Sequence, residues 1–563
     1  MVLRVAVVGA GGSGLTCIKA CVEDGLEPVC FESSDDIGGL WNFKEAPVPQ
    51  RSSIYRSLVV NTSKEMMCFS DFPMPADYPN FMHHPRLLEY LRLYAERFQL
   101  LRHVRFQTTV KSVKQRPDFC TSGQWDVVTS RDGEEEGHVF DAVLVCSGHY
   151  THPASPLLHL PGYETFSGRC LHSWDYKDGD AFRGKRVVVV GIGNSGGDIA
   201  VEISRSAEQT FLSTRRGSWV MGRMSRGGLP FDMTLITRLN NTLMQLLPES
   251  LLNWTVEREL NGRYDHRLYG LEPRHRILDR RPLINDDLPG RILQGALQMR
   301  AHLRGFTQSG VRFEDGSVEE NIDTVVFCTG YDGNFPFLPP ALSGGPNEDL
   351  VLYKSLFPPS LSPPTLAVTG IFQTKGPILP LVEMQARWAV KVFSGVSRLP
   401  PEEEMLEVVQ CEKRRNMKRW GAPSSPNTHR SGRVASVCGE DDLSDPCPRK
   451  AALQVDYIPY LDFMAEEVGV RPDLLKLLLT DPGLWVRVFF GPCTPYQYRL
   501  RGPGRWAGAR QAILTQWERV ARPFRTRPVP GPEDGPARFP PWRWMLVLAG
   551  AVMAVFLSRR EPV

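Results

Sequence analysis

The chain lacks the features that mark secreted, metal-binding and polyanion-binding proteins. Its 12 cysteines form no Cys-x-x-Cys pair and no disulfide-type spacing, which excludes a disulfide framework and indicates a reducing compartment. No cluster of residues has metal-ligand spacing. The 66 Lys and Arg nearly balance the 63 Asp and Glu, so the charge gives no reason to expect nucleic acid or another polyanion as a partner.

A hydrophobic run of about 20 residues, the length that spans a bilayer comfortably, is also missing. Residues 544–557 form an apolar run of 14 residues. A Pro-rich linker at 528–541 precedes it, and tryptophan and arginine flank it. We therefore expect 542–558 to be a short membrane anchor or an interfacial helix. The alternative, a buried terminal helix, would have little to pack against. No signal peptide is expected, because a strand begins at once.

The chain does contain the same glycine-rich turn twice. Gly9-Ala10-Gly11-Gly12-Ser13-Gly14 follows the strand-like residues 4–8, and Gly191-Ile192-Gly193-Asn194-Ser195-Gly196 follows residues 185–190. In such a unit the first Gly makes the turn, the second admits a pyrophosphate and the third packs helix on strand. We count Gly197 and Asp198, next on the second helix, among the binding residues. Two copies predict two dinucleotides, as in flavin enzymes that take hydride from a nicotinamide.

The residue after each second strand indicates which nucleotide binds where. Glu32 ends residues 27–31 and would accept hydrogen bonds from a ribose with free hydroxyls, as in FAD. Arg215 and Arg216 follow residues 209–214, where a guanidinium pair suits the 2′-phosphate of NADPH. We therefore predict FAD at the first turn and NADPH at the second. The alternative is a solvated strand end for Glu32 and a surface pair for the arginines.

Two further patterns extend this plan. Gly39, Leu40 and Trp41 follow the Glu-bearing strand, where paired glycines again allow backbone to approach a diphosphate. Residues 140–149 and 322–331 repeat each other as an apolar strand that ends in a small residue and Gly. We expect them to mark the two crossings between a flavin domain and an inserted NADPH domain.

The sequence thus predicts an α/β fold with two Rossmann-like dinucleotide-binding domains, a helical insertion and a C-terminal membrane-associated hydrophobic helix. At 563 residues the chain has room for two to four domains. The predicted parts are an FAD domain (1–150 and 331–420), an NADPH domain (151–213 and 296–330), a helical insertion (214–295), a Pro/Ser-rich disordered loop (421–452), a C-terminal helical region (453–527), the linker (528–541) and the anchor (542–558).

The segment 166–177, Phe-Ser-Gly-Arg-Cys-Leu-His-Ser-Trp-Asp-Tyr-Lys, matches FxGxxxHxxxY, the identifying sequence of the flavin-containing monooxygenases. Residues 61–71, 285–289, 383–388, 490–496 and 502–506 also resemble the vertebrate microsomal members of that family, and the resemblance covers nearly the whole length. The chain departs from the family at the 421–452 loop, at Cys328, where Ala is usual, and in residues 373–377, which differ from the common Gln-Pro-Leu-Gly. The last departure bears on substrate range rather than on reaction type.

The resemblance implies an NADPH- and O2-dependent monooxygenase that oxygenates soft nitrogen or sulfur centres, or ketones by Baeyer–Villiger oxidation, through a C4a-hydroperoxyflavin. It implies that Asn61 faces the flavin edge and donates from its amide; without the family, Asn61 would be a turn residue. Val60, Thr62 and Gln373 are counted as cofactor-binding with it. The implied partners are O2, small lipophilic nucleophiles such as xenobiotics, and lipid of the endoplasmic reticulum membrane, with the catalytic domains facing the cytosol. Homo-oligomerisation is left open.

Two other functions fit the two glycine turns. A membrane-attached NADPH:quinone-type reductase would pass electrons on without oxygenating a substrate. A non-catalytic redox sensor would bind both nucleotides and show no NADPH-dependent O2 uptake. A disulfide reductase is excluded, because no redox cysteine pair follows the first unit.

Overall fold

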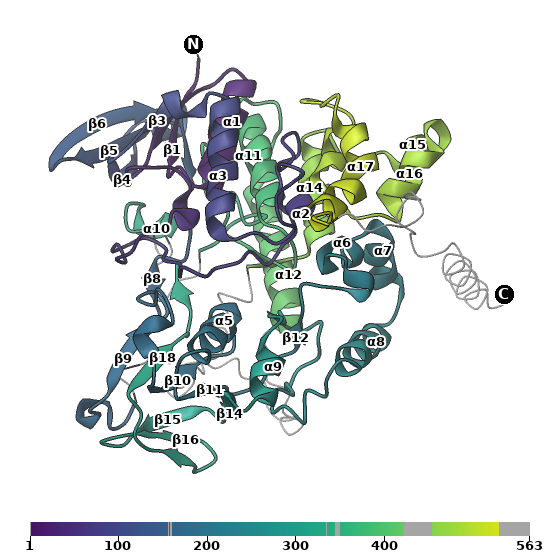
Figure 1. Cartoon of the computed structure of the whole chain (residues 1–563). Helices are drawn as coiled ribbons and strands as arrows, with labels where there is room; N and C mark the ends of the chain where they lie inside the picture. Colours follow the sequence, from purple (N-terminus) through teal and green to yellow (C-terminus); the bar gives the residue numbers. More distant parts are fainter. Residues whose placement is uncertain are drawn as a thin grey trace, which may run out of the picture.

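Two parallel sheets with their helices form the α/β framework of the chain (Figure 1). The computed structural model describes residues 2–527 except 156, 158–159, 334, 344–349 and 421–452. The predicted loop at 421–452, the linker at 528–541 and the anchor at 542–558 lie outside the described residues. Within the described part, no helix is both long enough and apolar enough to cross a bilayer.

The first parallel sheet has the strand order β20-β7-β1-β2-β3. Its strands are β1 (Arg4–Val8), β2 (Glu27–Phe31), β3 (Val104–Arg105), β7 (Ala142–Val145) and β20 (Leu366–Val368). Both faces of this sheet are covered, which is why β1 is apolar at consecutive positions. Val5 and Val7 join one buried cluster with helices α1 (Gly12–Glu23), α3 (His84–Arg97) and α11 (Leu379–Phe393).

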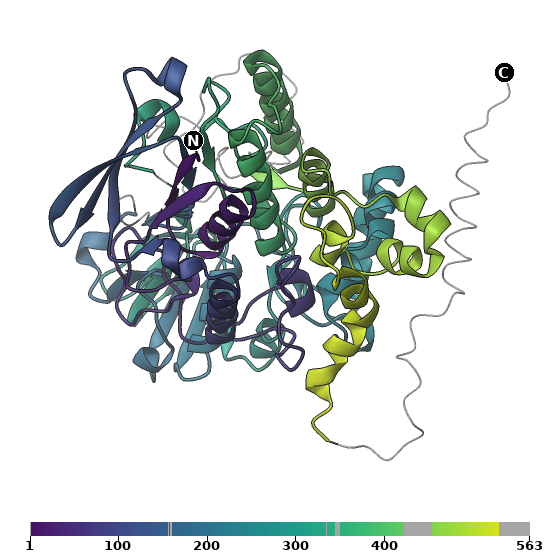
Figure 2. The same cartoon turned by 90° about the horizontal axis from the view of Figure 1, so that it is seen from above.

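The opposite face of β1 packs against an antiparallel sheet. Ala6 and Val8 share a second buried cluster with Trp125 and Phe140. These aromatic residues belong to the sheet β4 (Thr109–Gln115), β5 (Trp125–Arg131) and β6 (Glu134–Phe140). Figure 2 shows this sheet (dark blue) on the side of the molecule away from the C-terminal helices (yellow-green).

The second parallel sheet repeats this arrangement in the order β14-β11-β10-β18-β9. Its strands are β9 (Arg169–His172), β10 (Arg186–Val190), β11 (Gln209–Ser213), β14 (Leu297–Arg300) and β18 (Thr324–Phe327). Val187 and Val189 pack toward α5 (Asn194–Ile203). Val188 and Val190 pack toward the antiparallel sheet β15 (Leu303–Phe306), β16 (Val311–Phe313) and β17 (Val318–Glu319).

The repeated segments 140–149 and 322–331 play the same structural part in the two halves. Asp141 accepts a hydrogen bond from the backbone N–H of Arg4 at 2.8 Å, and Asp323 accepts one from that of Arg186 at 2.8 Å. Each aspartate therefore fixes the start of the strand that leads into a glycine turn. The chain passes between the halves after β7 and after β18, where β8 (His152–Pro153) and β19 (Tyr331–Asp332) pair antiparallel.

The residues between β11 and β14 are mostly helical and include α6 (Phe231–Leu235), α7 (Arg238–Leu246), α8 (Glu249–Asn261) and α9 (Leu288–Leu293). The predicted helical insertion is broken within residues 234–239, where α6 ends and α7 begins. Thr237 makes the break: its hydroxyl accepts from the N–H of Asn240 at 3.0 Å and caps α7. A parallel pair of strands, β12 (Val220–Met221) and β13 (Leu283–Ile284), closes the insertion.

The C-terminal helices pack beside the insertion helices (Figures 1 and 2). The contact is backbone to backbone at one point, where the N–H of Cys493 donates to the carbonyl of Ile236 at 2.8 Å. The helices of this region are α14 (Tyr457–Glu467), α15 (Leu474–Thr480), α16 (Pro482–Phe489) and α17 (Ala509–Ala521), and α12 (Glu402–Trp420) precedes them in the chain.

The shorter elements complete the framework. They are α2 (Lys64–Met67), α4 (Phe119–Ser122), α10 (Pro340–Ser343), β21 (Gln373–Thr374), β22 (Gln454–Val455) and the 3₁₀ turns η1 (Gly39–Trp41), η2 (Leu100–His103), η4 (Tyr163–Thr165), η5 (Asp180–Phe182), η6 (Arg226–Gly228), η7 (Pro495–Arg499) and η8 (Arg522–Phe524).

Candidate functional site

The first glycine turn has the shape that only glycine allows. Gly9 adopts φ +100°, and a Cβ there would lie 2.9 Å from the carbonyl oxygen of Cys146. A Cβ on Gly14 would lie 1.9 Å from the carbonyl oxygen of Gly9, so any larger residue would push α1 off β1. Gly11, between them, is half-buried, and a Cβ there would meet the Cα of Gly39 at 3.5 Å. This is a cradle of the kind that accepts a pyrophosphate at a helix N-terminus.

Glu32 braces this turn from the end of β2. Its buried carboxylate accepts from the N–H of Ala10 at 2.8 Å and from the N–H and hydroxyl of Ser34 at 2.8 and 2.7 Å. The alternative of a solvated strand end is therefore wrong, because only 5% of Glu32 is exposed. Gly12 and Ser13 begin α1 at the same turn.

The paired glycines after β2 lie against the first turn. The N–H of Gly38 donates to the carbonyl of Ala10 at 3.0 Å. A Cβ on Gly39 would lie only 3.1 Å from the Cα of Gly11. Leu40 and Trp41 continue this segment as η1 and are half-buried. The structure thus brings the Gly38-Gly39 pair against the glycine turn at residues 9–14.

The second turn repeats the first one closely. Gly191 adopts φ +106°, and a Cβ there would lie 2.6 Å from the carbonyl oxygen of Cys328. A Cβ on Gly196 would lie 1.9 Å from the carbonyl oxygen of Gly191. Gly193 has no atom within 4 Å of its ideal Cβ, so this glycine leaves space for an approaching group. Gly197, by contrast, is buried against Leu283.

Arg215 and Arg216 line a cavity of about 500 Å³ at the end of β11. Arg274 and Arg300 line the same cavity, with Glu272 and Glu319. Arg300 is paired with Glu319 at 2.6 Å. The cavity is therefore rich in guanidinium groups, as a phosphate-binding site requires. Arg274 could not be predicted from the sequence, because it follows β11 by some 60 residues and no local motif marks it.

Asn194 and Asp198, two of the predicted binding residues on α5, form hydrogen bonds to other segments of the chain. Asn194 is exposed, and its Oδ1 accepts from the N–H of Ile284 at 3.0 Å. Asp198 accepts from the hydroxyl of Tyr55 at 2.7 Å and from the amide of Asn285 at 2.6 Å. Burial raises the pKa of Asp198 above its ordinary value. Ser195, half-buried between them, lies in the first turn of α5.

Asn61 lies at a turn next to the insertion, and Arg223 fixes its side chain. Nη2 of Arg223 donates to Oδ1 of Asn61 at 2.7 Å, and Nε donates to the carbonyl of Val60 at 3.2 Å. A guanidinium has no acceptor, so the oxygen of the Asn61 amide must face it. Nδ2 therefore points away from Arg223 and, within the described residues, donates to no other group.

Arg223 also connects Asn61 to the second glycine turn. Its Nη1 pairs with Asp286 at 2.8 Å. Asp286 follows Asn285, which is bound to Asp198 on α5. Thr62, next to Asn61, donates its hydroxyl to the sulfur of Met67 at 3.0 Å. The described contacts therefore join Asn61 to the second unit through side chains of the insertion.

Gln373 is not joined to either glycine turn by a described contact. Its N–H donates to the carbonyl of Leu453 at 2.7 Å, and its Oε1 accepts from the amide of Gln454 at 2.7 Å. Two residues on, Lys375 donates to the carbonyl of Leu278 in the insertion at 2.8 Å. Burial lowers the pKa of Lys375 to about 7.

Comparison with known proteins gives one consistent family. A family model described as flavin-binding monooxygenase-like matches residues 2–559. Flavin-containing monooxygenase 5 of Cavia porcellus is 50% identical over 524 residues, which are 93% of each chain. Dimethylaniline monooxygenase (N-oxide-forming) 2 of Rattus norvegicus is 48% identical over 539 residues, which are 96% of each chain.

Solved structures share the fold at lower identity. S-allyl-L-cysteine S-oxygenase from Allium sativum superposes with a TM-score of 0.60 at 23% identity, over 93% of this chain and 99% of that one. Cyclohexanone monooxygenase from Rhodococcus sp. Phi1, bound to NADP+, gives a TM-score of 0.57 at 18% identity, over 83% of this chain and 98% of that one. These likenesses show the α/β flavoprotein monooxygenase fold.

Proposed function

The chain belongs to the flavin-binding monooxygenase-like family, and from this premise we propose that it oxygenates soft nitrogen and sulfur nucleophiles of small lipophilic compounds. Family membership makes it a monooxygenase that uses FAD, NADPH and O2. Membership of this family favours a monooxygenase over a quinone-type reductase and over a non-catalytic redox sensor. Dimethylaniline monooxygenase, one of the relatives, is named for forming N-oxides, which supports the nitrogen centre.

We assign FAD to the first glycine turn and NADPH to the second. The carboxylate at the end of β2 supports the first assignment, and the arginine-lined cavity at the end of β11 supports the second. When bound at the first turn, FAD would supply the redox and oxygen chemistry. The residues of the chain bind and orient both nucleotides, exclude water and supply hydrogen-bond donors.

The orientation of the Asn61 amide is the observation that carries this function. Arg223 holds Oδ1, so Nδ2 is kept as a donor that no described residue uses. A preorganised donor of this kind stabilises negative charge on an oxygen atom in a site from which water is excluded. We assign that task to Asn61.

The test replaces this donor by an acceptor of nearly the same shape. In Asn61→Asp, NADPH oxidation should be largely kept, while product formed per NADPH falls roughly a hundred- to a thousandfold, the typical loss for one such donor. Hydrogen peroxide should account for the missing oxygen. The measurement is a parallel assay of NADPH, peroxide and oxygenated product.

Asn240→Asp is the matched control, because it makes the same chemical change on α7, where the amide bonds only to the carbonyls of Thr234 and Leu235. In this control, the product formed per NADPH should remain as in the wild type. An Asn61→Asp variant that also stays coupled would remove Asn61 from the mechanism.

We also propose that the protein is attached to the endoplasmic reticulum membrane with its catalytic domains in the cytosol. The ten cysteines of the described residues are all free thiols, which suits a reducing compartment. Leu475 and Leu479 on α15 are 69% and 75% exposed. Adjacent exposed leucines of this kind favour contact with lipid, and the apolar segment 542–558 favours the same partner.

A further inference from the structure

Two side chains from the base of one loop hold the turn that carries Asn61. Residues 223–231 form a hairpin, in which the N–H of Phe231 donates to the carbonyl of Arg223 at 3.0 Å and the N–H of Ser225 donates to that of Leu229 at 2.8 Å. Arg223 and Asp232 therefore leave this loop next to each other. Arg223 binds Val60 and Asn61, as described above.

Asp232 binds the same turn from the other side. Its Oδ2 accepts from the backbone N–H of Ser63 at 2.6 Å, across 169 residues of sequence. Its Oδ1 accepts from the N–H of Met233 at 2.9 Å. Only 1% of Asp232 is exposed, so its oxygens depend on donors of the protein rather than on water, and the Ser63 hydroxyl also stabilises the charged form. A buried carboxylate is stable only with such partners.

The bond to Ser63 fixes the backbone next to Asn61. Ser63 starts α2, where its carbonyl accepts from the N–H groups of Met66 and Met67 at 3.1 and 2.9 Å. Its N–H would be an unsatisfied buried donor without Asp232. With Arg223 on the carbonyl of Val60, the turn is held on both sides of Asn61.

At neutral pH it is the ionised carboxylate of Asp232 that accepts these hydrogen bonds. Burial raises the pKa of Asp232 to about 6, while the N–H groups of Ser63 and Met233 act against that rise. Above this pKa the group is ionised and accepts both hydrogen bonds. Charge-assisted bonds of this kind are stronger than neutral ones.

We propose that Asp232 is a positioning residue for the oxygen chemistry: it fixes the backbone turn from which Asn61 presents its amide. It acts through Ser63 and touches no reacting atom. This inference rests on the role of Asn61 given above.

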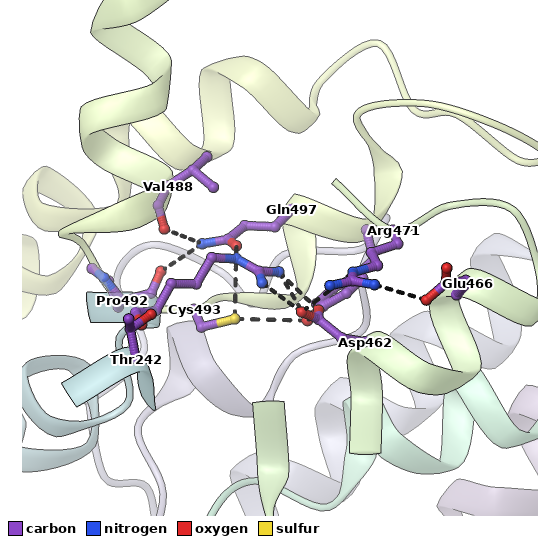
Figure 3. A network of polar contacts seen from close by, with 10 residues as sticks. Thr242, Asp462, Glu466, Arg471, Val488, Pro492, Cys493 and Gln497 are labelled. Carbon is purple, nitrogen blue, oxygen red and sulfur yellow. Dashed lines mark hydrogen bonds and ion pairs between the residues drawn. The ribbon is translucent and has the colours of Figure 1, made fainter. Parts of the chain in front are cut away.

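The positioning role of Asp232 has to be distinguished from a purely structural one, and a second carboxylate that binds the insertion serves as a matched control. Asp462 is also a mostly buried carboxylate bound to the insertion, through Arg238 at 2.7 and 3.0 Å. Figure 3 shows Asp462 beside Arg471, in a network with Cys493 and Gln497. No described contact of Asp462 reaches the Asn61 turn. Asp462→Asn therefore weakens the anchoring of the insertion and leaves the turn intact.

The experiment compares Asp232→Asn with Asp462→Asn as FAD-containing full-length proteins. An Asn side chain has one acceptor oxygen for the two N–H donors of Ser63 and Met233 and turns its own NH2 group toward the other. In Asp232→Asn, the amides of residues 60–67 should therefore exchange hydrogen faster, and product per NADPH should fall at least about tenfold, a smaller loss than removal of the donor itself. In Asp462→Asn, the melting temperature should fall, while exchange at 60–67 and coupling stay as in the wild type.

A double variant adds a second readout. If Asp232 acts through Asn61, then Asp232→Asn should cause no further uncoupling in the Asn61→Asp background, because residues that act as one unit are not additive. Should Asp232→Asn be purified without FAD, Asp232→Ser takes its place in the same assays, because it also keeps one acceptor oxygen but brings no NH2 group into the buried site.

Three outcomes overturn the inference: unchanged exchange at 60–67, wild-type coupling in the Asp232 variant, or additive effects in the double variant. A coupled Asn61→Asp variant is a different result, because it refutes the proposed role of Asn61. The exchange measurement still reports whether Asp232 holds the turn in that case.

Discussion

At the scale of single residues, we propose that Arg215 and Arg216 decide which coenzyme the second turn binds. NADPH and NADH differ only in the 2′-phosphate, and these arginines line the cavity at the end of β11. Replacing both arginines by Gln should weaken the binding of NADPH far more than that of NADH, because each charge-assisted hydrogen bond to the 2′-phosphate contributes about 1.5–3 kcal/mol. Steady-state kinetics with both coenzymes measures the effect.

Arg304→Gln serves as the control for this change. Arg304 is paired with Glu314 at 2.6 Å, outside the residues that line the cavity, and its loss should leave the coenzyme preference unchanged. Equal losses for NADPH and NADH in the double variant would contradict the assignment.

Lys375 gives a prediction for the pH dependence of stability. Burial lowers its pKa from an ordinary value of 10.5 to about 7. Between these values the unfolded chain binds more protons than the folded protein, so the cost to stability grows as pH falls and is complete below about pH 7. Proton linkage therefore predicts that Lys375→Met raises the melting temperature more at about pH 6.5 than at about pH 9.5.

Thermal unfolding at the two pH values checks this expectation. Lys111→Met, at an exposed position of β4, is the control and should show no such difference. An equal gain at both pH values would mean that the Lys375 ammonium is not disfavoured in the folded protein.

Sequence patterns predict residues whose role depends on the local backbone. Gly9, Gly14, Gly191 and Gly196 are required by contacts with the next few residues or with an adjacent strand. Arg223 and Asp232 could not be predicted in this way, because their partners lie 162 and 169 residues away. The pair Gly227-Gly228 marks a tight loop, but it does not indicate what the loop contacts.

At the scale of elements, the buried strands were predicted well because parallel strands are continuously apolar. β1, β2 and β10 occupy the predicted ranges within one residue. The pair β12 and β13 was missed, since strands of two residues carry no periodic pattern. The break between α6 and α7 was missed because Thr237 breaks the helix through a side-chain cap rather than through Gly or Pro.

The anchoring of α7 supplies a prediction at this scale. Arg238, at the start of α7, is buried and bound to Asp462, Gln497 and Tyr498. Removing one member of a buried ion pair costs about 3–5 kcal/mol, because the other charge is left unpaired. Arg238→Met and Asp462→Leu should each lower the free energy of unfolding by that amount.

The double replacement should cost clearly less than the sum of the two single ones, since it leaves no unpaired charge. Chemical denaturation followed by fluorescence measures all three variants. Additive losses would show that the two residues stabilise the protein independently.

At the scale of the whole molecule, two similar halves are connected by paired strands, and the insertion bridges them to the C-terminal helices. The halves could be predicted because each is a local strand–turn–helix unit. The docking of the insertion could not, because its ion pair with Asp462 spans 224 residues. Nothing in the residues around Arg238 indicates that partner.

The proposed membrane attachment concerns the whole molecule as well, and we expect two surfaces to contribute to it. Deleting the chain from Pro541 onward should leave a folded, FAD-containing enzyme, because the Pro- and Gly-rich composition of residues 528–541 predicts a linker before this segment. Binding to phosphatidylcholine/phosphatidylserine vesicles should fall but persist, because Leu475 and Leu479 on α15 are 69% and 75% exposed. Leu475→Ser with Leu479→Ser in the truncated protein should reduce it further.

The control for this last step uses two leucines that are equally exposed elsewhere. Leu268 and Leu293 are 80% and 76% exposed, so Leu268→Ser with Leu293→Ser removes comparable apolar surface away from α15. If apolar area alone governed binding, both pairs would reduce vesicle cosedimentation alike. If α15 is the docking surface, only its own pair will do so. A truncated protein that stays fully bound with the α15 pair replaced would assign attachment to another face, and loss of FAD on truncation would place the terminal segment in the core.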